Sequence, residues 1–341
     1  MSTFIPDGEL FKHAERVKGR VVLITGAANG IGKEAAIRFA SHGAKIVIGD
    51  RDEVNGRKVV SEIEDLGGSA TFSRIDVTNW DDQVELFDHA IATYNSVDVV
   101  VANAGVGEGS HITALEFKDG KPLAPSLLTL DVNISGSVYT ATLALHYLTI
   151  GQKEGDLKAL VFIGSMASWV RAPHAELYTT SKHAVLGLMR ALHETGDRLG
   201  IRVGCIHPFF ADTDILPIPA KLFLVGIPFT TTARIAGAIF RAATDPDPST
   251  SAASWMLPDN GPVFFLPKEE LRLGVYEMID NRVNAMTSGV RGIVFYSQLV
   301  SDLWQIARPL QKYAFAGSAL AFAWNQRVQL QALFSNIGLG Q

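Results

Sequence analysis

The chain is poor in cysteine, in charge and in long apolar runs. Cys205 is the one cysteine among 341 residues, which excludes a disulfide framework and any zinc site built on paired cysteines. It lies in an apolar, strand-like run, so we expect a buried thiol. Charged residues make up 19% of the chain and the formal net charge is −5, so the basic surplus typical of nucleic-acid-binding proteins is missing.

Targeting and metal-binding signals are missing as well. Residues Met1–Arg20 are polar and charged where a secretory signal needs an apolar segment. The longest strongly apolar stretch, Tyr313–Trp324, is too short to span a bilayer unaided. The nine histidines form no His-Glu-x-x-His or comparable cluster. We expect a soluble, cytoplasmic protein without a metal or a nucleic-acid partner.

Apolar residues, at 47% of the chain, are sufficient for a sizeable core. From Val21 to Val203, short β-rich runs alternate with longer amphipathic stretches. The β-rich runs are Val21–Thr25, Lys45–Gly49, Thr71–Ile75, Val97–Ala102, Ala159–Ile163 and Ile201–His207. The helical patterns are Ile31–His42, Glu53–Leu66, Asp81–Tyr94, Leu127–Leu148 and Ala175–Leu199. This order predicts an α/β fold: a doubly wound, Rossmann-like parallel sheet with helices on both faces.

Three parts of the chain follow from this alternation. We expect an N-terminal extension over residues 1–17, a single domain over residues 18–290 and a helical C-terminal tail over residues 291–341. Within the domain, the polar segments Asp119–Pro125 and Gly151–Lys158 are predicted surface loops. Beyond Pro208 the sequence predicts a helix at Thr232–Ala243, a loop at Thr244–Ser254 and a last strand at Val263–Leu266.

A glycine-rich turn joins the first predicted strand to the first helix. Thr25 is followed by Gly26-Ala27-Ala28-Asn29-Gly30-Ile31-Gly32. Glycines there permit a tight turn and let backbone N–H groups approach a pyrophosphate at the helix N-terminus. Asp50 ends the next strand, and its carboxylate can accept hydrogen bonds from an adenosine ribose while repelling a 2′-phosphate. This pattern predicts dinucleotide binding, with NAD favoured; the cations Arg51 and Lys33 keep NADP open.

Six motifs in order make the chain resemble the short-chain dehydrogenase/reductase family over about residues 18–270. They are Thr25–Gly32, Asp76-Val77, Asn103-Ala104-Gly105, Asn133, Ser165 and the Tyr-x-x-x-Lys pair Tyr178 and Lys182. The resemblance implies a set of cofactor-binding residues. These are Gly26, Asn29, Gly30, Ile31, Gly32, Asp50, Arg51, Asp76, Val77, Asn103, Ala104, Gly105, Tyr178, Lys182, Pro208 and Thr213. Asp76 and Val77 should flank the adenine; Asn103–Gly105 should support the sheet edge, although a plain strand-to-helix turn also fits that segment.

Catalysis is implied by four residues. Tyr178 and Lys182 are four apart and share one helix face, and an ammonium near a phenol lowers the pKa of the phenol from its reference value near 10. By the resemblance Tyr178 is the general acid/base, and Lys182 lowers its pKa and binds the nicotinamide ribose. Ser165 contacts the substrate oxygen, and Asn133 holds a water in a proton relay. Taken singly, Ser165 also fits a helix N-cap, and Asn133 fits a cap or local hydrogen bonds.

The segment after the sixth strand departs from the family pattern. Phe209 and Phe210 follow Pro208 where relatives have glycine, which puts the expected contact of Thr213 with the nicotinamide carboxamide in doubt. By resemblance, residues 209–230 form a substrate lid, and this one is mostly apolar. An apolar lid favours a lipophilic substrate; packing in a core or interface is the alternative.

The function predicted from these residues is NAD(H)-dependent interconversion of a lipophilic secondary alcohol and its ketone, by a homodimer or homotetramer. An NADPH-dependent ketoreductase of secondary metabolism is the second hypothesis, and a nucleotide-sensing scaffold without turnover is the third. The intact set Ser165, Tyr178 and Lys182 speaks against the scaffold.

The tail, residues 291–341, lies outside the resemblance. It holds four basic residues and one acidic residue, a formal +3. Leu299, Val300, Leu303, Trp304 and Ala307 fall on one helical face, which Pro309 should end. Tyr313–Trp324 is apolar nearly all round and needs a cover. The protein's own core, a sister subunit and a membrane surface that basic flanks favour are the three candidates.

Overall fold

The computed structural model describes residues 2–211, 213, 215, 221, 224–271, 279, 300–301, 303–304, 308 and 322–329. By its contacts the chain divides into two compact units, Met1–Leu271 and Arg272–Gln341. Residues 1–17, assigned above to an extension, therefore belong to the first unit. In the second unit the described residues are helical and exposed; most of the predicted tail, including Leu299, Ala307, Pro309 and Tyr313, lies outside them.

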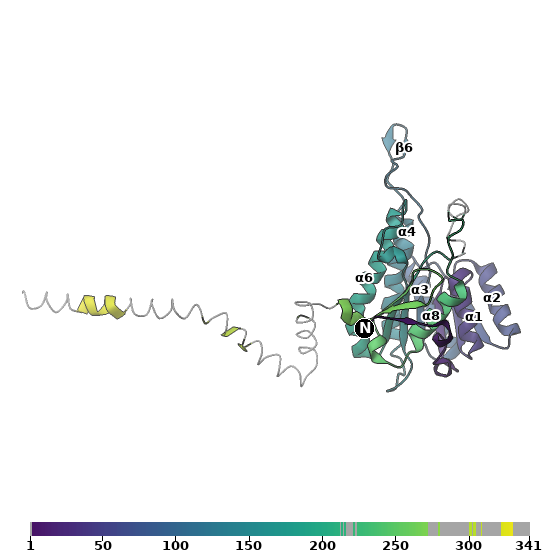
Figure 1. Ribbon diagram of the computed structural model, residues 1–341, viewed down its shortest axis with the longest axis horizontal. Coiled ribbons are helices and arrows are strands. Elements are labelled where there is room, and N and C mark those ends of the chain that lie inside the picture. The colour runs from purple at the N-terminus through teal and green to yellow at the C-terminus, as the bar shows by residue number, and fades with distance from the viewer. Residues whose placement is uncertain are drawn as a thin grey trace, which may run out of the picture. The chain divides into compact units, whose positions relative to one another are not determined.

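The first unit is built on a nine-stranded sheet with the order β1-β11-β10-β9-β8-β5-β2-β3-β4. Figure 1 shows this unit with its helices packed around the sheet. The strands from β4 to β10 are parallel to one another. Strand β11 pairs antiparallel with β10, and β1 pairs antiparallel with β11. The strands are β1 Thr3–Ile5, β2 Val21–Thr25, β3 Lys45–Asp50, β4 Ser69–Arg74, β5 Val99–Ala102, β8 Ala159–Ile163, β9 Arg202–Pro208, β10 Ser254–Leu257 and β11 Val263–Leu266.

Helices cover both faces of this sheet. Those of the first unit are α1 Gly30–Ser41, α2 Glu53–Asp65, α3 Trp80–Tyr94, α4 Leu128–Leu130, α5 Gly136–Tyr147, α6 Glu176–Leu199 and α8 Thr232–Thr244. Short 3₁₀ turns are η1 Asp7–Glu9, η2 Ala14–Val17, η4 Met166–Ser168, η5 Pro248–Thr250 and η6 Lys268–Leu271, and η3 Asp131–Ser135 is a π-helical turn. Strand β2 shows why two layers form: Val22 and Ile24 pack on the face of α1, α2 and α8, whereas Val21 and Leu23 pack on the face of α3, α5 and α6. The predicted doubly wound fold is confirmed.

Three segments differ from the sequence-based predictions. The predicted loop Thr244–Ser254 contains η5 and ends at the start of β10, a strand that the sequence pattern did not predict. The predicted loop Asp119–Pro125 contributes to a small exposed hairpin of β6 Phe117–Lys118 and β7 Lys121–Pro122. The expected surface loop Gly151–Lys158 ends inside the protein, because Leu157 and Lys158 are buried. Strands of two to four residues carry little local signal, and pairing with β9 and β11 defines β10.

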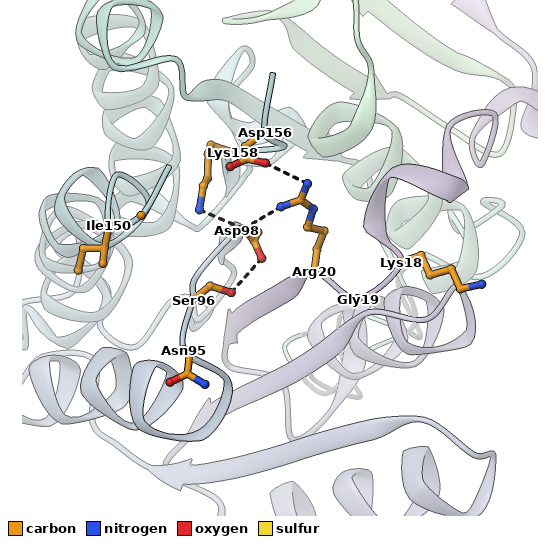
Figure 2. Close-up of a pocket in the computed structure, with 10 residues that line it drawn as sticks. Lys18, Gly19, Arg20, Asn95, Ser96, Asp98, Ile150, Asp156 and Lys158 are labelled. Atoms are coloured by element: carbon orange, nitrogen blue, oxygen red, sulfur yellow. Dashed lines mark hydrogen bonds and ion pairs between the residues drawn. The ribbon is translucent and has the colours of Figure 1, made fainter. Parts of the chain in front are cut away.

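A cluster of charges lies at the amino ends of β2, β5 and β8, beside a cavity of about 380 Å³ (Figure 2). The buried carboxylate of Asp98 accepts hydrogen bonds from the backbone N–H of Val21 at 2.8 Å and from Lys158 Nζ at 3.0 Å. Arg20 lies 3.7 Å from Asp98 and donates to Asp156 at 3.1 Å. Each charge has a partner of opposite sign, so this cluster ties the sheet together at the edge opposite the glycine-rich turn.

Among the described residues, no helix combines the length and the apolar character needed to cross a membrane. In the same part of the chain, no three His, Cys, Asp or Glu side chains come together as metal ligands.

Candidate active site

The glycine-rich turn between β2 and α1 has the geometry of a phosphate cradle. Gly26 and Gly30 adopt positive φ angles of 69° and 55°. A Cβ on Gly26 would lie 2.6 Å from Ala104 Cα, and one on Gly32 would lie 2.3 Å from Gly26 O. The N-cap of α1, Asn29, makes no side-chain cap. The first N–H groups of α1 are thus available to an anion, and these residues fit the pyrophosphate of a dinucleotide.

Asn103 connects the ends of two neighbouring strands beneath the cradle. Its Nδ2 donates to the carbonyl oxygens of Thr25 at 2.9 Å and Gly26 at 2.8 Å. Its backbone N–H and that of Ala104 both lie 3.2 Å from Thr25 Oγ1, which accepts from them. The Asn103–Gly105 motif therefore holds the turn in shape, a role beyond that of a plain strand-to-helix connection.

The residues expected around the adenosine lie at the carboxyl ends of β3 and β4. Asp50 accepts hydrogen bonds from the backbone N–H groups of Ala28 at 2.9 Å and Asp52 at 3.0 Å, and its two oxygens retain further acceptor capacity. Arg51 is exposed, whereas Lys33 forms an ion pair with Glu62 at 2.7 Å. Hydrogen bonds from the backbone and hydroxyl of Thr78 lower the pKa of Asp76. Val77 is buried and in close contact with Gly136.

Ser165, Tyr178 and Lys182 meet beyond the carboxyl end of β8. Ser165 is the N-cap of η4, where its Oγ accepts from Ala167 N at 3.0 Å, and it also hydrogen-bonds the Tyr178 side chain. Lys182 lies one turn after Tyr178 on α6; its Nζ donates to Ile163 O at 2.9 Å and lies 5.6 Å from the centre of the Tyr178 ring. Ser165 is thus an N-cap and at the same time a partner of the Tyr178 side chain, and its contact with a substrate oxygen stays a prediction.

Asn133 projects from the π-helical turn η3 toward the same place. Its Oδ1 accepts from Val106 N at 2.8 Å, and its Nδ2 donates to Val106 O at 3.0 Å and Ser181 Oγ at 2.9 Å. A Cβ on Gly105 would lie 3.2 Å from Asn133 Oδ1 and 3.5 Å from Lys182 Nζ. The side chain of Asn133 therefore holds the loop after β5 against α6.

Burial dominates the ionisation of these groups. It raises the pKa of Tyr178, and the hydrogen bond from Ser165 opposes that rise. It lowers the pKa of Lys182 to about 8 because a buried ammonium loses hydration; the nearby Cys205 acts in the other direction. Burial likewise raises the pKa of the Cys205 thiol to about 12, so this cysteine is a neutral core residue at physiological pH. The expected lowering of the tyrosine pKa by Lys182 is not among the causes acting on Tyr178 here.

The start of residues 209–230, the segment predicted to form a substrate lid, also lies at the site. Pro208 ends β9, and Thr213 lies over the glycine turn: its Cγ2 would be 3.4 Å from a Cβ on Gly30. The rings of Phe209 and Phe210 stack edge to face with centroids 4.7 Å apart. A bridge between Ala211 and Thr230 closes the base of the segment. Residues 212, 214, 216–220 and 222–223 lie outside the described residues.

Several residues at the site were not found from the sequence. His207 is fully buried below Ser165, and its Nδ1 donates to Ser165 O at 3.2 Å. Glu108 accepts from the backbone N–H of Tyr178 at 2.8 Å through Oε2. Trp169 packs against His207 with ring centroids 5.7 Å apart. Glu108 could have been suspected from the sequence, because it lies five residues beyond Asn103 in a loop that follows a strand end, where functional residues are common. His207 lies inside a strand, and no sequence pattern marked it as a site residue.

Comparison with known proteins decides the family. The family model described as short chain dehydrogenase matches residues 20–218. The chain belongs to the short-chain dehydrogenase family. It is therefore an oxidoreductase acting on CH–OH groups, in a family that binds NAD or NADP.

The chain is similar to individual short-chain dehydrogenases in sequence and in structure. The short-chain dehydrogenase/reductase ascJ of Acremonium egyptiacum is 35% identical over 65% of this chain and 72% of its own. Secoisolariciresinol dehydrogenase of Forsythia intermedia is 34% identical over 56% of this chain and 67% of its own. The structure of a 3-ketoacyl-(acyl-carrier-protein) reductase from Brucella melitensis complexed with NADH superposes with a TM-score of 0.62 at 25% identity, covering 72% of this chain and 98% of that one.

Proposed function

We propose that this short-chain dehydrogenase interconverts a secondary alcohol and its ketone with NAD(H) as coenzyme. The observation that carries the proposal is the meeting of Ser165, Tyr178 and Lys182 beside the glycine cradle. When bound, the coenzyme supplies or accepts the hydride. In the reduction the Tyr178 hydroxyl gives its proton to the carbonyl oxygen, which the Ser165 hydroxyl orients by a hydrogen bond, and in the oxidation both transfers reverse.

Two other groups prepare this proton transfer. Lys182 places a titratable amine one helical turn from the phenol, and its pKa of about 8 leaves it largely charged at neutral pH. Because burial rather than Lys182 governs the pKa of Tyr178 in the structure, we assign to Lys182 the binding of the nicotinamide ribose hydroxyls. Asn133 fixes the loop after β5 and, through Ser181, the first turn of α6.

The preference for NAD rests on Asp50 and on the environment of the two cations. Lys33 is paired with Glu62, so it is less available to a 2′-phosphate than the sequence suggests. NADPH remains the second candidate because Arg51 is exposed next to Asp50. A lipophilic substrate is supported by the described lid residues, which include Phe209, Phe210, Leu224 and Phe229. We expect a homodimer or homotetramer.

The test compares NAD with NADP across a panel of lipophilic secondary alcohols, followed by the absorbance of the reduced coenzyme. We expect turnover with NAD, and we expect Tyr178→Phe to lower kcat by about 10²–10⁴-fold because the proton donor is lost while coenzyme binding persists. Tyr139→Phe on α5 makes the same chemical change away from the site and should leave kcat unchanged. Activity of Tyr178→Phe within about tenfold of the parent contradicts the assignment.

A further inference from the structure

His207 is a buried polar side chain that the reaction proposed above does not use. It lies in β9, one residue before Pro208, and it is fully buried. Its Nδ1 lies 3.2 Å from the carbonyl oxygen of Ser165. A carbonyl oxygen can only accept a hydrogen bond, so Nδ1 carries the ring proton and Nε2 carries a lone pair. That Nε2 atom is buried and has no hydrogen-bond partner among the described residues.

The ring of His207 is neutral, and its packing alone does not explain a histidine. Burial lowers its pKa to about 3; the hydrogen bond with Ser165 opposes this change, and the cations Arg190 and Lys182 add to it. A buried nitrogen without a partner also costs stability, and an apolar side chain of similar size would avoid that cost. The group that such a side chain would lack is the Nδ1–H.

The surroundings of His207 leave the ring little freedom to move. A Cβ on Gly164, the residue after β8, would lie 2.6 Å from Nδ1 and 2.9 Å from Cε1 of the ring. Glycine at position 164 therefore makes room for the ring. Trp169 packs on the ring edge to face, with centroids 5.7 Å apart, and the guanidinium of Arg190 lies 4.9 Å from the centre of the Trp169 ring. The direction of the Nδ1–H bond is thus fixed by packing.

Ser165 has two kinds of hydrogen bond. Its carbonyl accepts from Ser168 N at 2.8 Å, its own N–H donates to Ser168 Oγ at 3.1 Å, and its Oγ accepts from Ala167 N at 3.0 Å. These bonds close the turn η4 on itself. The bond from His207 differs, because it ties Ser165 to β9, 42 residues away in the chain. It therefore orients the turn, and with it the Ser165 hydroxyl that bonds Tyr178, relative to the sheet.

We propose that His207 is a positioning residue for the oxidoreductase reaction, and that its Nδ1–H holds Ser165 in the orientation in which the serine hydroxyl bonds the phenol of Tyr178. His207 acts through Ser165 and not on a reacting atom. This inference rests on the proposed roles of Ser165 and Tyr178. Because the bond from Ser165 opposes the rise that burial causes in the pKa of Tyr178, loss of the His207 donor should raise that pKa further.

Two substitutions separate the donor from the packing of the ring. In His207→Asn the amide nitrogen is as many bonds from Cα as Nδ1, so the bond to Ser165 can persist while part of the ring volume is left empty. His207→Leu fills most of that volume and has no donor. We expect His207→Leu to lower kcat about 10–100-fold, because small misplacements of a reacting group have effects of this size. We expect His207→Asn to melt at a lower temperature and to retain most of the parental kcat.

The pH profile distinguishes positioning from a general loss of structure. In alcohol oxidation Tyr178 accepts the proton, so kcat rises with pH as the phenol ionises. We expect this rise to lie at higher pH in His207→Leu and at the parental pH in His207→Asn, with the Kd for NADH unchanged in both. The measurement uses the secondary alcohol of the panel above that the parent oxidises fastest. His146→Leu, an exposed histidine on α5, is the control and should keep the parental kcat and profile.

Each further outcome decides the inference. Parental kcat and pH profile in His207→Leu would overturn it, as would losses of kcat in both variants that simply follow their melting temperatures. If His207→Leu does not fold, His207→Gln takes its place, because its amide reaches the position of Nε2 and not that of Nδ1; it should show the same loss of kcat, and parental kcat in it would overturn the inference. If the parent oxidises no alcohol and reduces no ketone with either coenzyme, the proposed function itself fails, and this inference fails with it.

Discussion

Asp50 and Arg51 lie next to each other at the end of β3 and should act in opposite directions on coenzyme choice. Asp50→Ala removes the negative charge that repels a 2′-phosphate and leaves Arg51 exposed to bind it. We expect the ratio of kcat/KM for NADP to that for NAD to rise at least tenfold, measured by coenzyme titration. Asp65→Ala, at the exposed end of α2, should leave the ratio unchanged. A parent enzyme that already prefers NADPH would contradict this role of Asp50.

His207 predicts a pH dependence of stability. Burial lowers its pKa from 6.5 to about 3 in the folded state, so between these values the unfolded chain binds more protons. The contribution of neutral His207 is complete above pH 6.5 and is lost as the pH falls toward 3. Between pH 6.5 and 3 the free energy of unfolding of the parent should fall by up to about 1.4 kcal/mol per pH unit because of His207. We expect His207→Gln to lack this part of the pH dependence, measured by urea unfolding at several pH values. Parallel pH curves for variant and parent would rule this out.

At the scale of elements, glycine is required at the start of α1 but can be replaced in the middle of α6. Gly32→Ala puts a methyl group 2.3 Å from Gly26 O, so the phosphate cradle must distort. Gly187→Ala meets no atom within 4 Å on the exposed side of α6. We expect the first to raise the Kd of NADH at least tenfold; the second should stabilise the protein by about 0.5–1 kcal/mol and leave the Kd unchanged. Equal NADH affinity in both variants would disprove the role of the cradle.

Element η3 shows what a local pattern does not reveal. The apolar periodicity of residues 127–148 predicts one continuous helix, and the structure has α4, the π turn Asp131–Ser135 and α5. A π turn inserts one residue into the helical spacing and turns a side chain toward a new direction. It places Asn133 against Val106 and Ser181, residues 27 and 48 positions away in the chain. The motif was visible in the sequence, but these partners were not.

At the scale of the whole molecule, the sheet is stabilised at both ends of its parallel strands, and the buried pair of Asp98 and Lys158 belongs to the amino end. Lys158→Met leaves Asp98 buried with one partner fewer, which typically costs about 3–5 kcal/mol. We expect that loss in urea unfolding together with an unchanged Kd for NADH, because the cradle lies at the carboxyl ends of the strands. Lys58→Met, on the exposed face of α2, should change stability by less than about 0.5 kcal/mol. A Lys158→Met protein of parental stability would contradict the role of the pair.

Periodicity and spacing in the sequence predict six of the seven parallel strands, most of the helices that cover them, and the residues of the cradle and the candidate catalytic set. The parallel strands are apolar runs because both faces are covered, and Thr25–Gly32 and Tyr178–Lys182 are encoded at fixed short spacings that local geometry requires. The tertiary structure alone decided the pairing of β1 with β11, the cap that Glu108 provides for α6 and the burial of His207 under Ser165. Each of these joins residues that are far apart in the chain. Their chemistry depends on burial and on partners, and neither is encoded in the spacing of neighbouring residues.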